Sequence, residues 1–250
     1  MNFKLKLFIP LLSVALFLSA CKDEDPKPFK QHVHLDILHE WNDSPLVLNQ
    51  AYIWNHGVKS DTITPTRLIY HINNLELLTE DSQVITAAQT YYMIDYGANE
   101  VLPEKIHFTT PTEGVKHYVN AIEFTVGIAD SLASATGTLN SLFVSPMYWG
   151  MISGYINFKF EALTPKTPLI YHIGGYKKPY YNWRRVRVVF NKPYFLNEDN
   201  TLRISADLLK LFDSATLIDT DKITEVQMPN ANSKIIADNM GQLFSFKDFR

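Results

Sequence analysis

The sequence predicts an all-β fold, an antiparallel β-sandwich with Greek-key links and short helical insertions. Aromatic residues are abundant, with 13 Tyr, 15 Phe and 4 Trp, and they lie beside β-branched residues in short runs, as strands require. Apolar and polar residues alternate with a period of two in several of these runs, and turn-forming residues separate them at short, irregular intervals. Because no segment shows a long 3.6-residue apolar period, the sequence argues against alternating βα units.

The clearest strand is predicted over residues 154–161, where Ile156 and Phe158 share one face and polar residues share the other. A second runs from Trp183 to Phe190 and stops before Pro193. Further strands are expected near residues 31–39, 46–54, 67–78, 84–94, 118–127, 168–174 and 201–207. Short helices are expected at residues 206–213 and 128–135.

The first 21 residues have the features of a bacterial lipoprotein export signal. Lys4 and Lys6 give a positive start, and the apolar run at 7–18 is too short to span a bilayer. The run ends on Leu18-Ser19-Ala20-Cys21, where small residues precede the thiol that would receive the lipid. Cys21 is the single cysteine of the chain, and in an exported protein acylation explains a lone cysteine better than a disulfide does.

Residues 22–30 are expected to form a flexible tether. Its start, Lys22-Asp-Glu-Asp25, resembles the tag that sends many Bacteroidetes lipoproteins to the outer face of the outer membrane. The alternative is a charged spacer without a sorting role, which Pro26 and Pro28 also fit. We therefore expect a lipid-anchored protein of the outer membrane, with cell-surface exposure as one of two interpretations.

Cleavage before Cys21 leaves 230 of the 250 residues, enough for one large β domain. We assign the sandwich domain to residues 31–215 and a C-terminal extension that docks on it to residues 216–250. The net charge of −3 argues against nucleic-acid binding, because there is no basic field. The motifs of hydrolases, nucleotide-binding loops and zinc proteases are missing, so we do not expect an enzyme.

Eight histidines make metal binding the main functional hypothesis, because histidine is the commonest metal ligand. His32 and His34 lie two apart on a predicted strand and so share a face, which fits a cation site or an ordinary solvated strand face. His56 and His71 flank a turn-rich stretch at 60–66. A hairpin there could bring the two imidazoles together, and the alternative is two unrelated surface histidines.

The string Met147-Tyr-Trp149-Gly-Met151 is the most unusual in the chain, although such strings are most often core packing. With it the sequence resembles the MbnP-like, methanobactin-associated family of exported copper-binding proteins, many of which are Bacteroidetes lipoproteins. The resemblance covers roughly residues 33–210. It rests on the ordered series His39…Pro45-Leu46, Asn55-His-Gly57, Arg67-Leu-Ile-Tyr-His-Ile-Asn-Asn-Leu75, Phe124-Thr-Val-Gly-Ile128 with Asp130, Met147-Tyr-Trp149…Gly154-Tyr155, and His172-Ile-Gly174.

The resemblance implies a β-sandwich that holds Cu(I) through two histidines and a kynurenine, which a partner dihaem cytochrome c peroxidase-like enzyme makes from tryptophan. Matching the motifs assigns the metal to His56, His71 and Trp149, for copper acquisition or buffering. One departure from the family pattern concerns this assignment, because Met151 stands where relatives often have a second tryptophan.

A hypothesis of another class is a metal-free surface lipoprotein that binds a glycan or a protein partner through exposed aromatics. Tyr176, Tyr180, Tyr181 and Trp183 are the residues that would stack on such a ligand. The alternative for this stretch is ring packing over a loop.

Replacing Cys21 with alanine should leave an unlipidated precursor, because this thiol is the only acceptor in the chain. Metabolic labelling with a fatty-acid analogue measures the effect. Equal incorporation into the wild type and the Cys21→Ala variant would remove the lipoprotein assignment.

Overall fold

The structure, a computed structural model, describes residues 31–89, 91–97, 106–109, 117–129, 147–150, 154–197 and 199–250. The predicted export signal, Cys21 and the tether lie outside the described residues, as do Asp130, Met151 and most of the helix expected at 128–135. None of the helices within the described ranges is long and apolar enough to cross a membrane.

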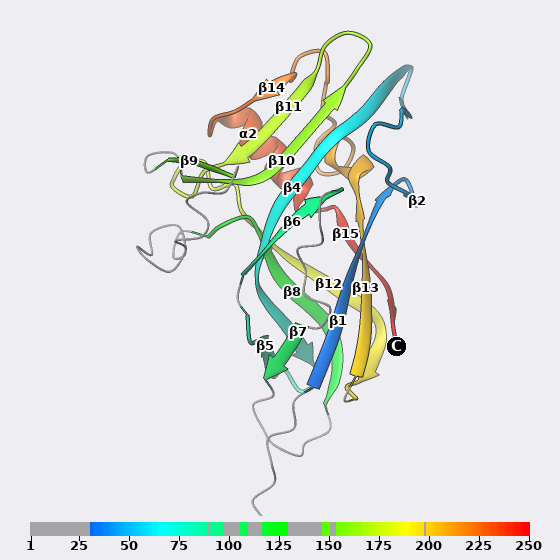
Figure 1. The fold of residues 1–250 in the computed structure, drawn as a ribbon, viewed down its shortest axis with the longest axis vertical. Coiled ribbons are helices and arrows are strands. Elements are labelled where there is room, and N and C mark those ends of the chain that lie inside the picture. The colour runs from blue at the N-terminus through cyan, green and yellow to red at the C-terminus, as the bar shows by residue number, and fades with distance from the viewer. Residues whose placement is uncertain are drawn as a thin grey trace, which may run out of the picture.

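The strands of the described residues belong to one curled sheet, and most neighbours pair antiparallel (Figure 1). The strands are β1 (Gln31–Trp41), β2 (Ser44–Pro45), β3 (Tyr52–His56), β4 (Lys59–Thr79), β5 (Val84–Ala87), β6 (Tyr91–Tyr96), β7 (Ile106–Thr109), β8 (Tyr118–Val126), β9 (Tyr148–Gly150), β10 (Gly154–Leu163), β11 (Leu169–Gly174), β12 (Arg184–Phe195), β13 (Asp199–Asp207), β14 (Glu225–Val226) and β15 (Phe244–Phe249). The all-β prediction is confirmed.

The sheet is mixed, whereas the sequence predicted a purely antiparallel one. β1 pairs parallel with β13, and β11 pairs parallel with β14. Parallel neighbours need a long connection, and here each pair joins segments that are far apart in the sequence. The strand expected at 46–54 is wrong over its first half, because the chain turns at Asn49 (φ 65°) and β3 begins only at Tyr52.

β4 is the longest strand, with 21 residues, and it organises the sheet. Along its length it pairs with β3, β5, β6, β8 and β10. In Figure 1 it crosses the whole molecule as the cyan ribbon, from the hairpin with β3 to the end near β5. The strands β6, β8 and β10 around the candidate site described below are therefore positioned by their register on β4, and β9 joins them by pairing with β10.

One main hydrophobic core lies inside the curled sheet. Phe212 is at its centre and packs against the rings of Trp41, Trp54, Phe160 and Tyr171, at centroid distances of 5.5–6.4 Å. Phe212 directly follows the 3₁₀-helix η1 (Leu208–Leu211), which lies within the predicted helix at 206–213. The helix starts where the Asp207 carboxylate accepts a hydrogen bond from the Leu209 amide.

The last 35 residues form β14, helix α2 (Ala231–Met240) and β15. A capping box of Asn230 and Ser233 begins α2, and Arg184 on β12 binds Asp238 near its end. β15 pairs antiparallel with β13, so this segment completes the sheet at that edge.

The fold should form without metal, because its large buried core supplies the stability and no metal bond is needed to close it. Thermal unfolding in excess chelator should remain cooperative, whereas Phe212→Ala should lower the free energy of unfolding by about 3–5 kcal/mol. A chain that stays unfolded until copper is added would contradict this view of the core.

Candidate metal site

His71 lies at the centre of β4, where the strand is buried on both faces. All residues from 68 to 73 are buried, although a strand at the surface of a sandwich normally exposes every second side chain. Tyr70 and Ile72 belong to the main core. Ile69 and His71 point to the opposite face, so a second layer must cover that side of the sheet.

The two ring nitrogens of His71 differ in their surroundings. Nδ1 forms a hydrogen bond with the hydroxyl of Tyr91 on β6. Nε2 is buried and has no hydrogen-bond partner within the described residues. Burial lowers the pKa of His71 to about 3, so the imidazole is neutral at physiological pH. In the tautomer with the proton on Nδ1, the lone pair of Nε2 is free for a metal ion.

The second layer comes from the chain around β9. Met147 is fully buried and packs with Ile69 and Ile156, and its carbonyl oxygen accepts a 2.8 Å hydrogen bond from the Ile156 amide. Met93 on β6 and Trp149 on β9 pack against this group. Met147 and Trp149 of the aromatic-methionine string therefore cover the outer face of β4 at Ile69, the face to which His71 also points.

Two contacts connect His71 to this layer. Met93 is the cross-strand partner of His71 in the pairing of β4 with β6. The ring of Tyr155 on β10 stands edge-on to His71, with 6.4 Å between centroids, and contacts the tilted ring of Tyr148 at a centroid distance of 4.9 Å. We call this group the outer cluster; its members are Ile69, His71, Tyr91, Met93, Met147, Tyr148, Trp149, Tyr155 and Ile156.

Gly174 allows the close approach of Trp149. A Cβ atom at Gly174 would lie 2.5 Å from Cζ3 of the indole and 2.5 Å from the carbonyl oxygen of Tyr155. Gly127 (φ 96°) has a related role, because a Cβ there would lie 2.7 Å from the Asn157 side chain. The amide of Gly127 also donates a 2.8 Å hydrogen bond to the carbonyl of His71, which fixes the backbone of the site.

A family model described as MbnP matches residues 30–233. The chain belongs to the MbnP family. This confirms the resemblance inferred from the motifs. Among solved structures, the MbnP from Methylosinus trichosporium is similar, with a TM-score of 0.51 and 13% sequence identity over 82% of this chain and 86% of that chain, a likeness of fold alone. No curated protein matches the chain.

In this MbnP family member, His56 and His71 do not meet. The predicted hairpin forms as β3 and β4, but its turn is short and the register pairs His56 with Lys59. His71 lies twelve positions further along β4, about 40 Å away at roughly 3.3 Å per residue of an extended strand. The hypothesis that these two histidines approach each other is therefore wrong.

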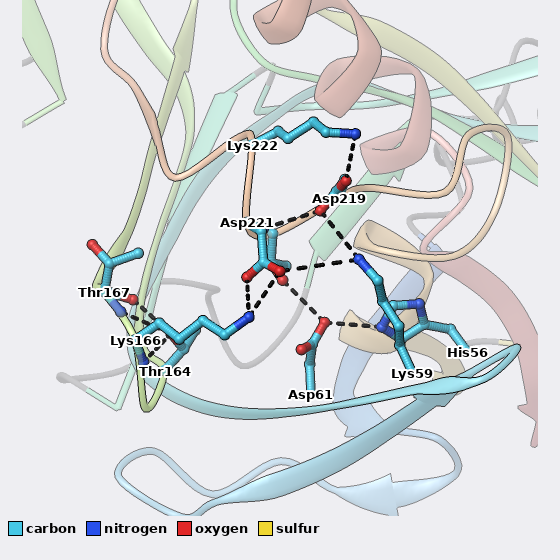
Figure 2. Close-up of polar contacts among 10 residues, drawn as sticks. His56, Lys59, Asp61, Thr164, Lys166, Thr167, Asp219, Asp221 and Lys222 are labelled. Carbon is cyan, nitrogen blue, oxygen red and sulfur yellow. Dashed lines mark hydrogen bonds and ion pairs between the residues drawn. The ribbon is translucent and has the colours of Figure 1, made fainter.

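His56 is instead part of an ion-pair network at the hairpin end of the sheet (Figure 2). Its ring stacks on Trp54 at 3.8 Å, and Nε2 donates to Asp61 over 2.9 Å. The Thr220 hydroxyl donates to the same carboxylate oxygen over 3.0 Å. Figure 2 shows Lys59, Lys166 and Lys222 beside this pair, where they bind the carboxylates of Asp219 and Asp221. These contacts hold the hairpin against the 219–222 turn.

The remaining predicted residues lie elsewhere. His172 binds Glu161 over 2.7 Å across β10 and β11. His39 is half-buried on the inner side of the sheet, where its Nε2 lies 2.9 Å from the Tyr70 hydroxyl and desolvation of the ring lowers its pKa to about 4. In the aromatic loop, Tyr181 is 37% exposed and its ring stands edge-on to Trp183.

The donor types of the outer cluster suit a soft metal ion. An imidazole nitrogen and the thioethers of two methionines are ligands that Cu(I) accepts, and the buried, unpaired Nε2 of His71 fits a bound ion. In the part of the chain that the structure describes, there is no group of three or more His, Cys, Asp or Glu side chains that could hold a metal ion. Harder ions prefer sites built from several carboxylates, and these residues contain no such site.

The sequence alone could not identify Met93 as a neighbour of His71, because this neighbourhood depends on the register of β6.

The carboxyl of Asp61 should contribute pH-dependent stability. Partial burial alone would raise its pKa, but the hydrogen bonds from His56 and Thr220 outweigh this and lower the pKa below its usual value. Such a group stabilises the fold above its unfolded pKa, and the contribution is lost as the pH falls through the folded pKa. Asp61→Asn should therefore cost about 1 kcal/mol at pH 7, with the difference from wild type shrinking below about pH 4.

Urea unfolding of wild type and Asp61→Asn at pH 7 and pH 3 measures this. Asp221→Asn, at a more exposed carboxylate of the same network, is the control and should change stability little. An Asp61→Asn effect of equal size at both pH values would show that charge is not involved.

Proposed function

We propose that this protein is an exported, lipid-anchored copper-binding protein that holds Cu(I) in the outer cluster, with His71 as the central ligand and Trp149 beside it. Membership of the MbnP family supports a copper-related role. The observation that carries the site assignment is the Nε2 atom of His71, buried, neutral and without a hydrogen-bond partner in the described chain. A buried polar atom of this kind costs stability unless something binds it.

The thioethers explain why the oxidation state would be Cu(I). Met93 is the register partner of His71, and Met147 is buried in the layer that covers the same face of β4, so the outer cluster contains two thioethers besides the imidazole. Soft thioether ligands select Cu(I) over harder ions. We include Met93 and Met147 in the proposed site in place of His56, which the hairpin register puts far away.

Trp149 is the candidate for oxidation to kynurenine, with peroxide as oxidant and a dihaem cytochrome c peroxidase-like partner as the enzyme. Cleavage of the indole C2–C3 bond would consume two molecules of peroxide and give N-formylkynurenine and two molecules of water. Hydrolysis would then release formate, leaving a ketone oxygen and an aryl amine next to the two methionines. Trp149 is half-buried on β9, with its ring against Gly174, so its oxidation would change the donors at the edge of the cluster without rebuilding the main core.

In this proposal the protein is a binding module and not an enzyme, and its role is to acquire or buffer copper at the outer membrane. Neutrality of His71 matters for that role, because metal binding requires a deprotonated imidazole. With a pKa near 3, His71 would not compete with protons over the pH range in which cells live. Copper retention should therefore change little between pH 8 and pH 5.

His71→Gln should lower the Cu(I) affinity at least tenfold, because the amide retains a group that can bond to Tyr91 but removes the imidazole ligand. Equilibrium competition with a coloured Cu(I) chelator measures the affinity. His39→Gln is the control, since His39 also has a lowered pKa and is also bound to a tyrosine hydroxyl, but it is half-buried on the inner face.

Both variants should lose apo stability to a similar degree, by about 1–3 kcal/mol, while only His71→Gln should lose copper. Equal copper affinity in the two variants would place the copper elsewhere. If neither wild type nor variant retains copper, glycan-array binding that Tyr181→Ala abolishes would support the metal-free alternative.

A further inference from the structure

His32 and His107 form a pair on the outer face of the sheet, at the end remote from the outer cluster. They are register partners in the antiparallel pairing of β1 with β7. Their ring centroids are 4.4 Å apart, with the planes at 75°. Figure 1 shows β7 beside the first residues of β1 at one end of the molecule, whereas β9 lies near the other end.

One nitrogen of this pair is buried without a partner. Nδ1 of His32 is inaccessible and makes no hydrogen bond within the described ranges, while His107 is exposed. The edge-to-face contact of the two rings does not give this nitrogen a hydrogen-bond partner. The pair therefore combines an orphaned nitrogen with a neighbouring imidazole that solvent and solutes can reach.

His34, which the sequence suggested as the partner of His32, binds a carboxylate instead. His34 lies on the same face of β1, as alternation predicts, but its Nε2 lies 2.6 Å from the Asp36 carboxylate. On the other side of β1, Asp199 of β13 is the register partner of His32. His107, His32 and Asp199 thus follow one another across three strands about 4.8 Å apart, which adds a negative charge to the row.

We propose that His32 and His107 form a second metal site, a two-imidazole clamp for a divalent transition-metal ion, with water in the remaining positions. Two nitrogen ligands without thiolate or thioether favour borderline ions over Cu(I). Among these, Cu²⁺ should bind most tightly, as the Irving–Williams order requires. The clamp joins the first residues of β1 to β7, so a bound ion would fasten the end of the domain at which the described chain begins.

This site is independent of the proposed copper function of His71. Its ligands come from β1 and β7, and the outer cluster comes from β4, β6, β9 and β10. The two sites should also differ in the oxidation state they prefer, because their donors differ. Loss of one should leave the other intact.

The test uses the full chain in detergent, with Cu²⁺ and Zn²⁺ as probes and thermal unfolding and Cu²⁺ EPR as readouts. At a metal concentration a hundredfold above the dissociation constant, the unfolding midpoint of the wild type should rise by roughly 5–10 °C. His32→Gln and His107→Gln should each abolish this rise and lower Cu²⁺ affinity at least tenfold. His34→Gln and His71→Gln should keep both, and the EPR spectrum should show two nitrogen ligands.

Two results would overturn the proposal. The first is that the metal still stabilises the His107→Gln variant. The second is that His34→Gln abolishes the stabilisation as fully as His32→Gln does, because the ligands would then be two histidines along β1. Should His32→Gln prove too unstable to assay, His107→Gln decides alone, because His107 is exposed and its loss leaves the fold intact. The double variant His32→Gln/His107→Gln should bind no worse than either single variant, since one imidazole cannot form the clamp.

Discussion

Burial of β4 on both faces is the constraint on which the rest of the structure depends. Between residues 68 and 73 one face forms part of the main core and the other is sealed by β9 and the side chains of β6 and β10. Because neither face is open to water, the polar side chains there must be satisfied inside the protein. Asn73 meets this requirement only through its amide NH₂ group, which donates to the Gly127 carbonyl, because its Oδ1 has no partner within the described residues. His71 likewise meets it only through Nδ1. A neutral imidazole with one free nitrogen is the direct consequence.

Polar contacts around the cluster keep it in place without filling the free position on His71. Asn157 accepts a hydrogen bond from the Ile128 amide and donates to the Gly175 carbonyl, so it ties the ends of β8 and β11 to β10. Gly127 and Gly174 remove the side chains that would otherwise separate these segments. Such a frame would restrain the donors of the proposed site before an ion binds, which would reduce the ordering cost of binding.

Local patterns predicted much of the fold, because alternation is set by neighbours in the sequence. The strands at 154–161 and 183–190 and the opposite orientation of His71 and Tyr70 all follow from a period of two. The predicted stop before Pro193 is wrong, because β12 continues to Phe195 and its pairing with β8 is irregular between Val189 and Tyr194, where a proline is tolerated. Alternation could not show that the outer face of β4 is covered, since the covering strand β9 lies more than seventy residues later in the chain. The aromatic-methionine string was visible, but its position over His71 depends on the register between β9 and β10.

The sequence contained enough information to predict that His56 and His71 lie far apart. Gly57 has a positive φ of 62°, and with Val58 it forms a two-residue connection that pairs His56 with Lys59. Glycine at the first position of such a turn is a known hairpin signal, and it fixes the register far from residue 71. The cross-strand contact of His32 with His107 was not predictable, because β1 and β7 are joined by no local turn.

Copper K-edge X-ray absorption on the Cu(I)-loaded protein tests the central claim most directly, because it identifies the ligand atoms. A site in the outer cluster predicts imidazole nitrogen from one histidine together with sulfur scatterers from Met93 and Met147. The sulfur signal should fall when Met93 is replaced by leucine, which keeps the volume of the side chain. A first shell of two imidazoles without sulfur, unchanged in Met93→Leu, would contradict the account.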